Sequence, residues 1–320
     1  MLGFLNFHKP LGCTSHDCVS QVRRALRTKK VGHGGTLDPA ASGVLPMAVG
    51  QATRLLPYLP EGKAYEATIR FGLKTTTDDL EGDVLETAGV EGLSLKTIEG
   101  VLPEFVGTIP QVPPRYSAIQ VQGKRLYKLA RAGEAVEVPE RRVTIHALRV
   151  LNWRTTPYPE LDLAVECGSG TYIRSLARDL GDRLGTGATL AALIRTQSSG
   201  FHLGESVTIE TVQTQGAGVL LTPPQVLTHL TIVSLAPEDL QRWQRGQAIS
   251  LLSQGELSQA ELSQTESCPT ESSQGELSQA ESSQAEKAVL VCDPGGECLG
   301  LGQIYPADPH LLKPKVVFQE

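Results

Sequence analysis

A period-five repeat near the end of the chain is the feature that most restricts how this sequence can fold. Between Ser253 and Glu286, glutamate recurs at every fifth position, in units such as Leu-Ser-Gln-Ala-Glu. A five-residue period matches neither the turn of an α-helix nor the alternation of a strand, so no face of the segment stays apolar. A segment with little to bury cannot offset its chain entropy. The sequence predicts a disordered tandem insertion over residues 253–286, with an acidic interaction tract as the functional alternative.

The repeat also distorts the overall charge of the chain. The 320 residues carry a formal net charge of −6, and seven of the 35 acidic residues are the glutamates of the repeat. The rest of the chain holds 29 basic and 28 acidic residues, a net charge of +1. The acidic average is therefore no argument against a nucleic-acid partner, because charge has to be considered locally.

Outside the repeat, the spacing of apolar residues predicts an α+β fold. Apolar and polar residues alternate over residues 65–71 and 161–167, as in strands with one buried face, and helical spacing follows over residues 173–184. Thr14 or Ser15 can cap an earlier helix. Because strands and helices do not alternate regularly, a doubly wound parallel sheet is disfavoured.

The chain is predicted to divide into two domains. We expect a first domain over residues 1–232 and a small β-rich domain over residues 233–320, interrupted by the repeat. In the second domain, strands are predicted at residues 288–292, 299–305 and 315–318, with a turn at residues 293–296.

Cysteine usage and hydropathy indicate where the protein works. The six cysteines form no Cys-x-x-Cys pair and have no histidine at zinc-ligand spacing, which is typical of free thiols in a reducing cytosol and predicts no metal site. The apolar N-terminal stretch is too short for a signal peptide. No run approaches the roughly 18 apolar residues of a membrane helix. We expect a cytoplasmic protein with no membrane association.

A glycine-rich loop is predicted from Gly32 to Gly43, and it concentrates unusual residue types. Its glycines permit unusual backbone angles and close approach of a ligand, and it presents the polar side chains of His33, Thr36 and Asp38. The spacing does not fit a dinucleotide or P-loop motif. An aspartate before proline often only opens a turn or caps a helix. From this segment alone, Asp38 is either a catalytic group or a turn residue.

Two further segments are candidates for a site. Between Pro113 and Arg149, eight basic residues face three glutamates and interleave with tyrosines, which suits either nucleic-acid binding or a solvated basic surface. Arg174 falls in the first turn of the predicted helix, where the helix dipole disfavours a cation. A facing carboxylate would explain this placement and would itself be held ionised by the arginine. We therefore predict that Arg174 pairs with Asp38, with a surface arginine as the alternative.

The candidate residues belong to a series of motifs that runs in order along residues 1–200: Lys9-Pro10-x-Gly12-x-Thr14-Ser15, Gly32-His33-x-Gly-Thr36-Leu37-Asp38-Pro39, Gly50-x-Ala-Thr53-Arg54, Lys63-Ala64-Tyr65, Thr75-x-Thr77-x-Asp79-x-x-Gly82, Pro113-x-x-Tyr116-Ser117-Ala118, Gly123-Lys124-x-x-Tyr127 and Cys167-x-x-Gly-Thr171-Tyr172-Ile173-Arg174. Taken together, these motifs resemble the TruB family of tRNA pseudouridine synthases, of the bacterial type.

The resemblance implies an activity and roles for individual residues. Members of the family convert uridine 55 in the T loop of tRNA to pseudouridine, without cofactor or metal, after flipping the uridine out of the loop. Asp38 matches the nucleophile that detaches the base, which rotates and rejoins through carbon. Tyr65 matches the tyrosine that stacks on the flipped base and is a candidate for proton transfer. The other matches are His33, which supports the displaced loop, Tyr172 and Leu193, which line the uridine pocket, and Arg174, the partner of the nucleophile.

The resemblance also implies a fold and a set of partners. The fold is the pseudouridine synthase fold, a mixed and largely antiparallel sheet with flanking helices, followed by a small PUA-like β domain. The implied partner is the T arm of tRNA. The resemblance implies no obligatory protein partner, so we expect a monomer. A non-catalytic RNA-binding or RNA-folding protein is the alternative function. It would have no need for Asp38, Tyr65 and Arg174 together.

Overall fold

The computed structural model describes residues 1–117, 120–121, 124–125, 138–155, 158–251 and 286–319. The period-five repeat, apart from Glu286, lies outside the described residues. The same holds for most of the basic and aromatic residues between 118 and 137. The predictions made for these two segments are therefore not addressed by the structure.

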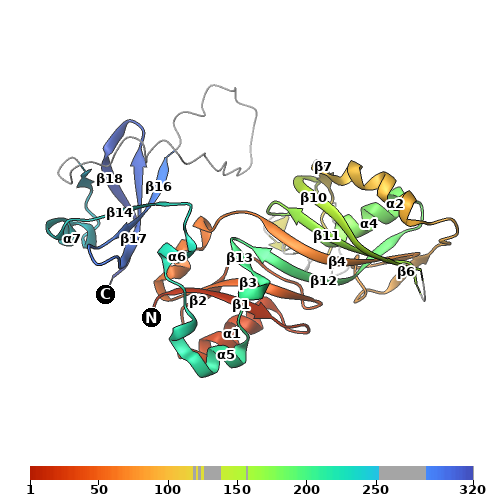
Figure 1. The fold of residues 1–320 in the computed structure, drawn as a ribbon, viewed down its shortest axis with the longest axis horizontal. Helices are drawn as coiled ribbons and strands as arrows, with labels where there is room; N and C mark the ends of the chain where they lie inside the picture. The colour runs from red at the N-terminus through yellow and green to blue at the C-terminus, as the bar shows by residue number, and fades with distance from the viewer. Residues whose placement is uncertain (118–119, 122–123, 126–137, 156–157, 252–285, 320) are drawn as a thin grey trace.

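A nine-stranded mixed sheet forms the larger part of the protein (Figure 1). Its strands are β1 (Gly3–Lys9), β2 (Val31–His33), β3 (Ala41–Val49), β4 (Lys63–Phe71), β7 (Gly107–Gln111), β10 (Arg141–Arg154), β11 (Glu160–Cys167), β12 (Ala188–Ser198) and β13 (Phe201–His202). The main path runs β1-β3-β12-β4-β11-β10-β7, with β2 beside β3 and β13 beside β12. Only β3 and β12 pair in parallel; the other pairs are antiparallel. The predicted largely antiparallel sheet is confirmed.

Short helices and two small hairpins flank this sheet. They are α1 (Ser15–Ala25), η1 (Gly50–Tyr58), α2 (Leu95–Val101), η2 (Leu102–Phe105), α4 (Ile173–Arg183), η3 (Leu203–Glu205), α5 (Ile209–Gln215), η4 (Gly216–Val219), α6 (Pro223–Val226), and the hairpins β5 (Leu73–Thr75) with β6 (Val84–Thr87) and β8 (Gln120–Val121) with β9 (Lys124–Arg125). Within the described parts of the chain, no helix combines the length and apolar character that a membrane span requires.

The sequence patterns account for the elements around the site. Thr14 begins α1 with a capping box: its side chain accepts from the backbone of Asp17, whose carboxylate accepts from the backbone of Thr14. Such a cap stabilises a helix by about 1 kcal/mol. Along β4 the apolar residues Tyr65, Ala67 and Ile69 alternate with more exposed ones and are buried in the core that also receives β11 and α4. The predicted strands and helices at these positions are confirmed.

A five-stranded sheet forms the C-terminal part (Figure 1). It contains β14 (Thr231–Ser234), β15 (Ile249–Ser250), β16 (Lys287–Cys292), β17 (Cys298–Tyr305) and β18 (Asp308–Val317), in the order β14-β16-β17-β18-β15. One helix, α7 (Pro237–Gln244), packs its fully buried Trp243 into the core of this sheet. The predicted β-rich C-terminal region is confirmed, and its last strand is longer than predicted because it already begins at Asp308. The domain division at residues 232 and 233 stays a prediction.

The C-terminal sheet is packed onto the first part of the chain. Leu290, Leu301 and Val316 share an apolar cluster with Phe4 and Leu55. Around it, the Arg54 guanidinium donates to the carbonyl of Val317 at 2.8 Å, and the backbone N–H of Gln319 donates to the side chain of Gln51 at 3.1 Å. The two parts are thus joined by a common core.

Candidate active site

The loop that carries Asp38 joins β2 to β3 and is shorter than the sequence indicated. Val31–His33 pairs with β3, and β3 begins at Ala41, so only residues 34–40 form the connection. Gly43 lies just inside β3 with a φ of +108°, and a side-chain Cβ there would come within 2.3 Å of the carbonyl oxygen of Arg195. Only glycine allows β3 to approach β12 this closely.

Asp38 is both a turn residue and an exposed acid. Its carbonyl accepts a hydrogen bond from the N–H of Ala41 at 3.0 Å, so its backbone does open a turn. Its side chain is 42% exposed, and its Oδ2 lies 2.8 Å from Nη2 of Arg174. The two interpretations of Asp38 are therefore compatible, because the backbone makes the turn while the carboxylate faces outward.

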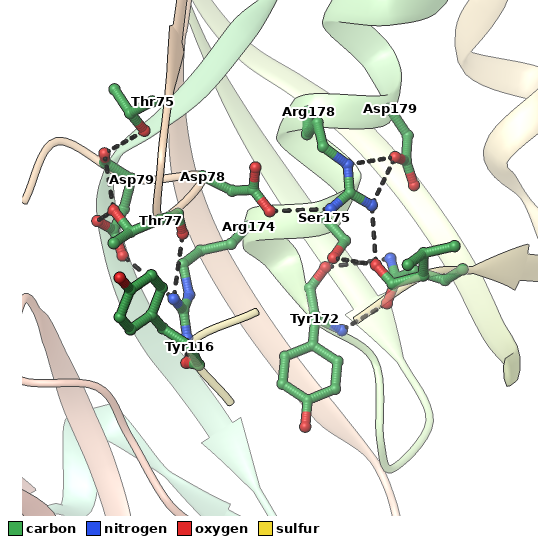
Figure 2. Close-up of polar contacts among 12 residues, drawn as sticks. Thr75, Thr77, Asp78, Asp79, Tyr116, Tyr172, Arg174, Ser175, Arg178 and Asp179 are labelled. Carbon is green, nitrogen blue, oxygen red and sulfur yellow. Dashed lines mark hydrogen bonds and ion pairs between the residues drawn. The ribbon is translucent and has the colours of Figure 1, made fainter. Parts of the chain in front are cut away.

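Arg174 links Asp38 to a second, buried acid. It is the second residue of α4, and its side chain is only 7% exposed. Its Nη1 lies 3.4 Å from Oδ2 of Asp79, whose side chain is 10% exposed. The guanidinium also donates to the carbonyls of Thr77 at 3.2 Å and Tyr116 at 3.1 Å (Figure 2). The predicted pairing of Arg174 with Asp38 is confirmed, while the acid on its other side was not predicted.

The segment after β5 holds Asp79 in place. The hydroxyl of Thr77 and the backbone N–H of Glu81 both donate to Oδ1 of Asp79, which leaves Oδ2 for Arg174. One turn along α4, Arg178 binds the carboxylates of Asp78 and Asp179 (Figure 2). Two arginines of one helix thereby fasten this segment over the start of α4.

A cavity of about 1010 Å³ opens in front of the Asp38–Arg174 pair. Its walls come from the Asp38 loop, β4, β12, the segment after β5 and the start of α4. All six residues singled out from the sequence line this one cavity: His33, Asp38, Tyr65, Tyr172, Arg174 and Leu193. Across the described residues, no three His, Cys, Asp or Glu side chains are arranged to hold a metal ion.

Burial governs the protonation of the other cavity residues. It raises the pKa of Tyr65 to about 12 and also raises the pKa of Tyr172, so both phenols are neutral near pH 7. It lowers the pKa of His33, which favours the neutral imidazole. Nδ1 of His33 accepts a hydrogen bond from the N–H of Gly35 at 3.4 Å, so Nε2 carries the proton of the neutral ring.

Two buried cations beneath the Asp38 loop escaped the sequence analysis as site residues. Lys9 is fully buried, and its Nζ donates to the carbonyls of Ala41 at 2.6 Å, Pro10 at 2.9 Å and Pro39 at 3.4 Å. Arg195 is 1% exposed and donates to carbonyls on the other side of the loop. Lys9 stands in the Lys-Pro motif, and Arg195 follows Leu193 by two residues on the same strand, so both lie near candidate residues in the sequence, but nothing there indicates what they bind.

Family models match most of the first part of the chain. The model described as "TruB family pseudouridylate synthase (N terminal domain)" matches residues 23–173. The model described as "tRNA pseudouridylate synthase B C-terminal domain" matches residues 174–218. The boundary between the two models falls between Ile173 and Arg174, so Arg174 and Leu193 lie in the second model, whereas Asp38 and Tyr65 lie in the first.

Similar proteins and solved structures agree with the match to these family models. A tRNA pseudouridine synthase B of Synechocystis sp. is 60% identical over 255 residues, which cover 78% of this chain and 86% of the relative. One from Microcystis aeruginosa is 46% identical over 321 residues and the full length of both. Two solved structures, an H/ACA RNP bound to a substrate RNA and a Cbf5-Nop10-Gar1 complex, share the fold with TM-scores of 0.66, identities of 22% and 23%, and coverage of 99% of this chain and 85% of theirs. The chain belongs to the TruB family of pseudouridylate synthases.

Proposed function

We propose that this protein converts uridine 55 in the T loop of tRNA to pseudouridine, with Asp38 as the nucleophile. The observation that carries the proposal is the exposed carboxylate of Asp38, held 2.8 Å from a nearly buried arginine at the wall of a large cavity. A carboxylate that is held in place and faces a cavity is suited to nucleophilic attack. The names of the relatives supply the substrate class, tRNA.

The reaction sets requirements that the cavity residues can meet. The N1–C1′ bond of uridine is replaced by a C5–C1′ bond, and one proton moves from C5 to N1, so substrate and product have the same composition. The site must therefore hold the detached base while it turns and must move a proton. We assign the holding of the base to the ring of Tyr65, with Tyr172 and Leu193 as the pocket walls, since aromatic rings stack on extruded bases. Tyr65 is also the proposed proton-transfer group, and His33 the support for the displaced loop.

The remaining assignments concern partners and location. The T arm of tRNA is the proposed partner of the first domain, and we propose a monomer that works in the cytoplasm without an obligatory protein partner. The division into residues 1–232 and 233–320 is part of the same proposal. It is supported by the separate C-terminal sheet, although β14 already begins at Thr231.

The proposal predicts product at one position of a defined RNA. Incubation of the protein with an unmodified tRNA transcript should produce pseudouridine at position 55, located by carbodiimide modification and primer extension. A transcript in which this uridine is replaced by cytidine is the matched control. A transcript that stays unmodified in the T loop would contradict the proposed function and would favour a non-catalytic RNA-binding or RNA-folding protein.

The period-five repeat should be dispensable for this reaction. Deleting residues 253–286 removes seven acidic residues and no basic ones, and none of the described cavity residues falls in this range. We expect the rate of pseudouridine formation to stay within about threefold of wild type, since fewer acidic charges can only weaken the repulsion of RNA phosphates. A loss of activity above tenfold in a deletion variant that melts like wild type would mean that the repeat takes part in RNA capture.

A further inference from the structure

Arg195 is a buried cation that lacks an acidic partner among the described residues. It lies in β12, between β3 and β4, and is 1% exposed. Its Nε donates to the carbonyl of Val44 at 2.7 Å, and its Nη1 and Nη2 donate to the carbonyls of Thr36 and Gly35 at 3.3 Å each. No ion pair joins it to an Asp or Glu of the described chain.

Burial of such a charge costs free energy, and the backbone carbonyls that surround Arg195 show what the charge stabilises. An enclosed cation loses its hydration, and carbonyl dipoles replace only part of it. Two of the carbonyls that compensate Arg195 belong to the loop that carries Asp38, two and three residues before it. The guanidinium thereby fixes the path of the backbone that leads into the proposed nucleophile.

The same residue stands next to the proposed proton-transfer group. Arg195 and Tyr65 are directly paired across β12 and β4, so their side chains lie on the same face of the sheet. Burial is the largest influence on Tyr65 and raises its pKa, while the neighbouring Arg195 acts in the opposite direction. Arg195 is not among the residues that line the cavity, and any effect on the reaction must pass through the residues that do.

We infer that Arg195 is a positioning residue for pseudouridine formation, which holds the Asp38 loop and the phenol of Tyr65 in a fixed mutual geometry. The inference rests on the proposed function. It assigns to Arg195 an influence on the chemical step and none on the capture of RNA, because the side chain is out of reach of the substrate. A displacement of reacting groups by about 1 Å can lower a rate by about 100-fold.

The test compares Arg195→Met and Arg195→Lys by single-turnover kinetics and by filter binding of tRNA. In Arg195→Met, we expect the single-turnover rate to fall by about 100-fold, with a change in the Kd for tRNA below threefold. In Arg195→Lys the charge is kept, but a compact ammonium does not reproduce the planar fork of Nε, Nη1 and Nη2 that reaches the three carbonyls, so an intermediate loss of about tenfold is expected. Arg154→Met is the matched control: Arg154 lies on β10, pairs with Asp162 and Glu160, and does not line the cavity.

A double-mutant cycle with Tyr65→Phe separates positioning from a structural role. If Arg195 acts partly through the phenol, Arg195→Met should cost at least tenfold less in the Tyr65→Phe background than in wild type. An equal cost in both backgrounds would overturn the inference, as would a rate of Arg195→Met within threefold of wild type. If circular dichroism shows that Arg195→Met does not fold, Arg195→Lys replaces it in the double-mutant cycle. A wild-type single-turnover rate of Arg195→Lys would then show that Arg195 has only a structural role. A wild-type protein that makes no pseudouridine would instead refute the proposed function.

Discussion

Asp38→Asn abolishes pseudouridine formation if Asp38 is the nucleophile, and leaves the affinity for tRNA nearly unchanged. An amide has the shape of the carboxylate but neither its charge nor its nucleophilicity, so the covalent step is lost. We expect the single-turnover rate to fall by at least about 10⁴-fold, which corresponds to about 5 kcal/mol of lost transition-state stabilisation. The Kd for tRNA, measured by filter binding, should stay within about threefold of wild type, because the cavity keeps its shape.

Asp78→Asn is the matched control for this change. Asp78 lies near the site and pairs with Arg178, but it does not line the cavity. Its φ of +61° is a conformation that asparagine tolerates well. We expect this variant to keep its rate within about tenfold of wild type, since it loses only an ion pair that fastens the segment after β5. Activity of Asp38→Asn near that of the wild-type protein would remove Asp38 from the role of nucleophile.

Arg174→Met should lower both the activity and the stability of the protein. Removal of the guanidinium leaves the buried carboxylate of Asp79 without its cation, and breaking a buried pair in this way costs about 3–5 kcal/mol. The contact with Asp38 adds less stability, because that carboxylate is 42% exposed and water screens it. The Tm should fall by on the order of 10 °C. Activity should fall with it, because Asp38 loses the cation that holds its carboxylate in position.

A second substitution can separate the two losses. In the double variant Arg174→Met with Asp79→Asn, the buried charge is gone and the amide oxygen can still accept from Thr77 and Glu81. We expect the Tm to recover by at least half of the loss while the single-turnover rate stays low, since the double variant still lacks the partner of Asp38. Recovery of both quantities would mean that Arg174 serves only the fold. Arg174→Lys, which keeps a charge but cannot bridge two acids, should lie between wild type and Arg174→Met in both measurements.

The pairing of Asp38 with Arg174 shows how far sequence reasoning reaches into this site. The two residues are far apart in the chain, and the prediction came from a cation at the start of a helix, where the dipole makes it unfavourable. That local conflict pointed to an external carboxylate, and the structure places one at 2.8 Å. The strands around the site were predictable for a related reason, because period-two burial leaves a direct trace in the sequence.

The residues that were missed interact in ways that leave no such trace. Lys9 and Arg195 bind backbone carbonyls, which every residue type provides, so no complementary acid appears in the sequence. Asp79 reaches Arg174 only because the segment after β5 folds over the start of α4, and this closure depends on tertiary contacts. The glycine-rich loop was predicted too long, since the pairing of β2 with β3 depends on a strand partner beyond the loop itself.

The place of β12 between β3 and β4 has a consequence for how the substrate must behave. Leu193 and Arg195 pair with β3 on one side and with β4 on the other, and such central strands belong to the last parts of a protein to open. We therefore expect the floor of the site to keep its shape when a nucleotide binds. Most of the free-energy cost of the conformational change on binding then comes from the RNA, which has to unstack and flip out its own base. RNAs whose loops open at lower cost should accordingly be captured sooner, even where they offer the protein no additional contact.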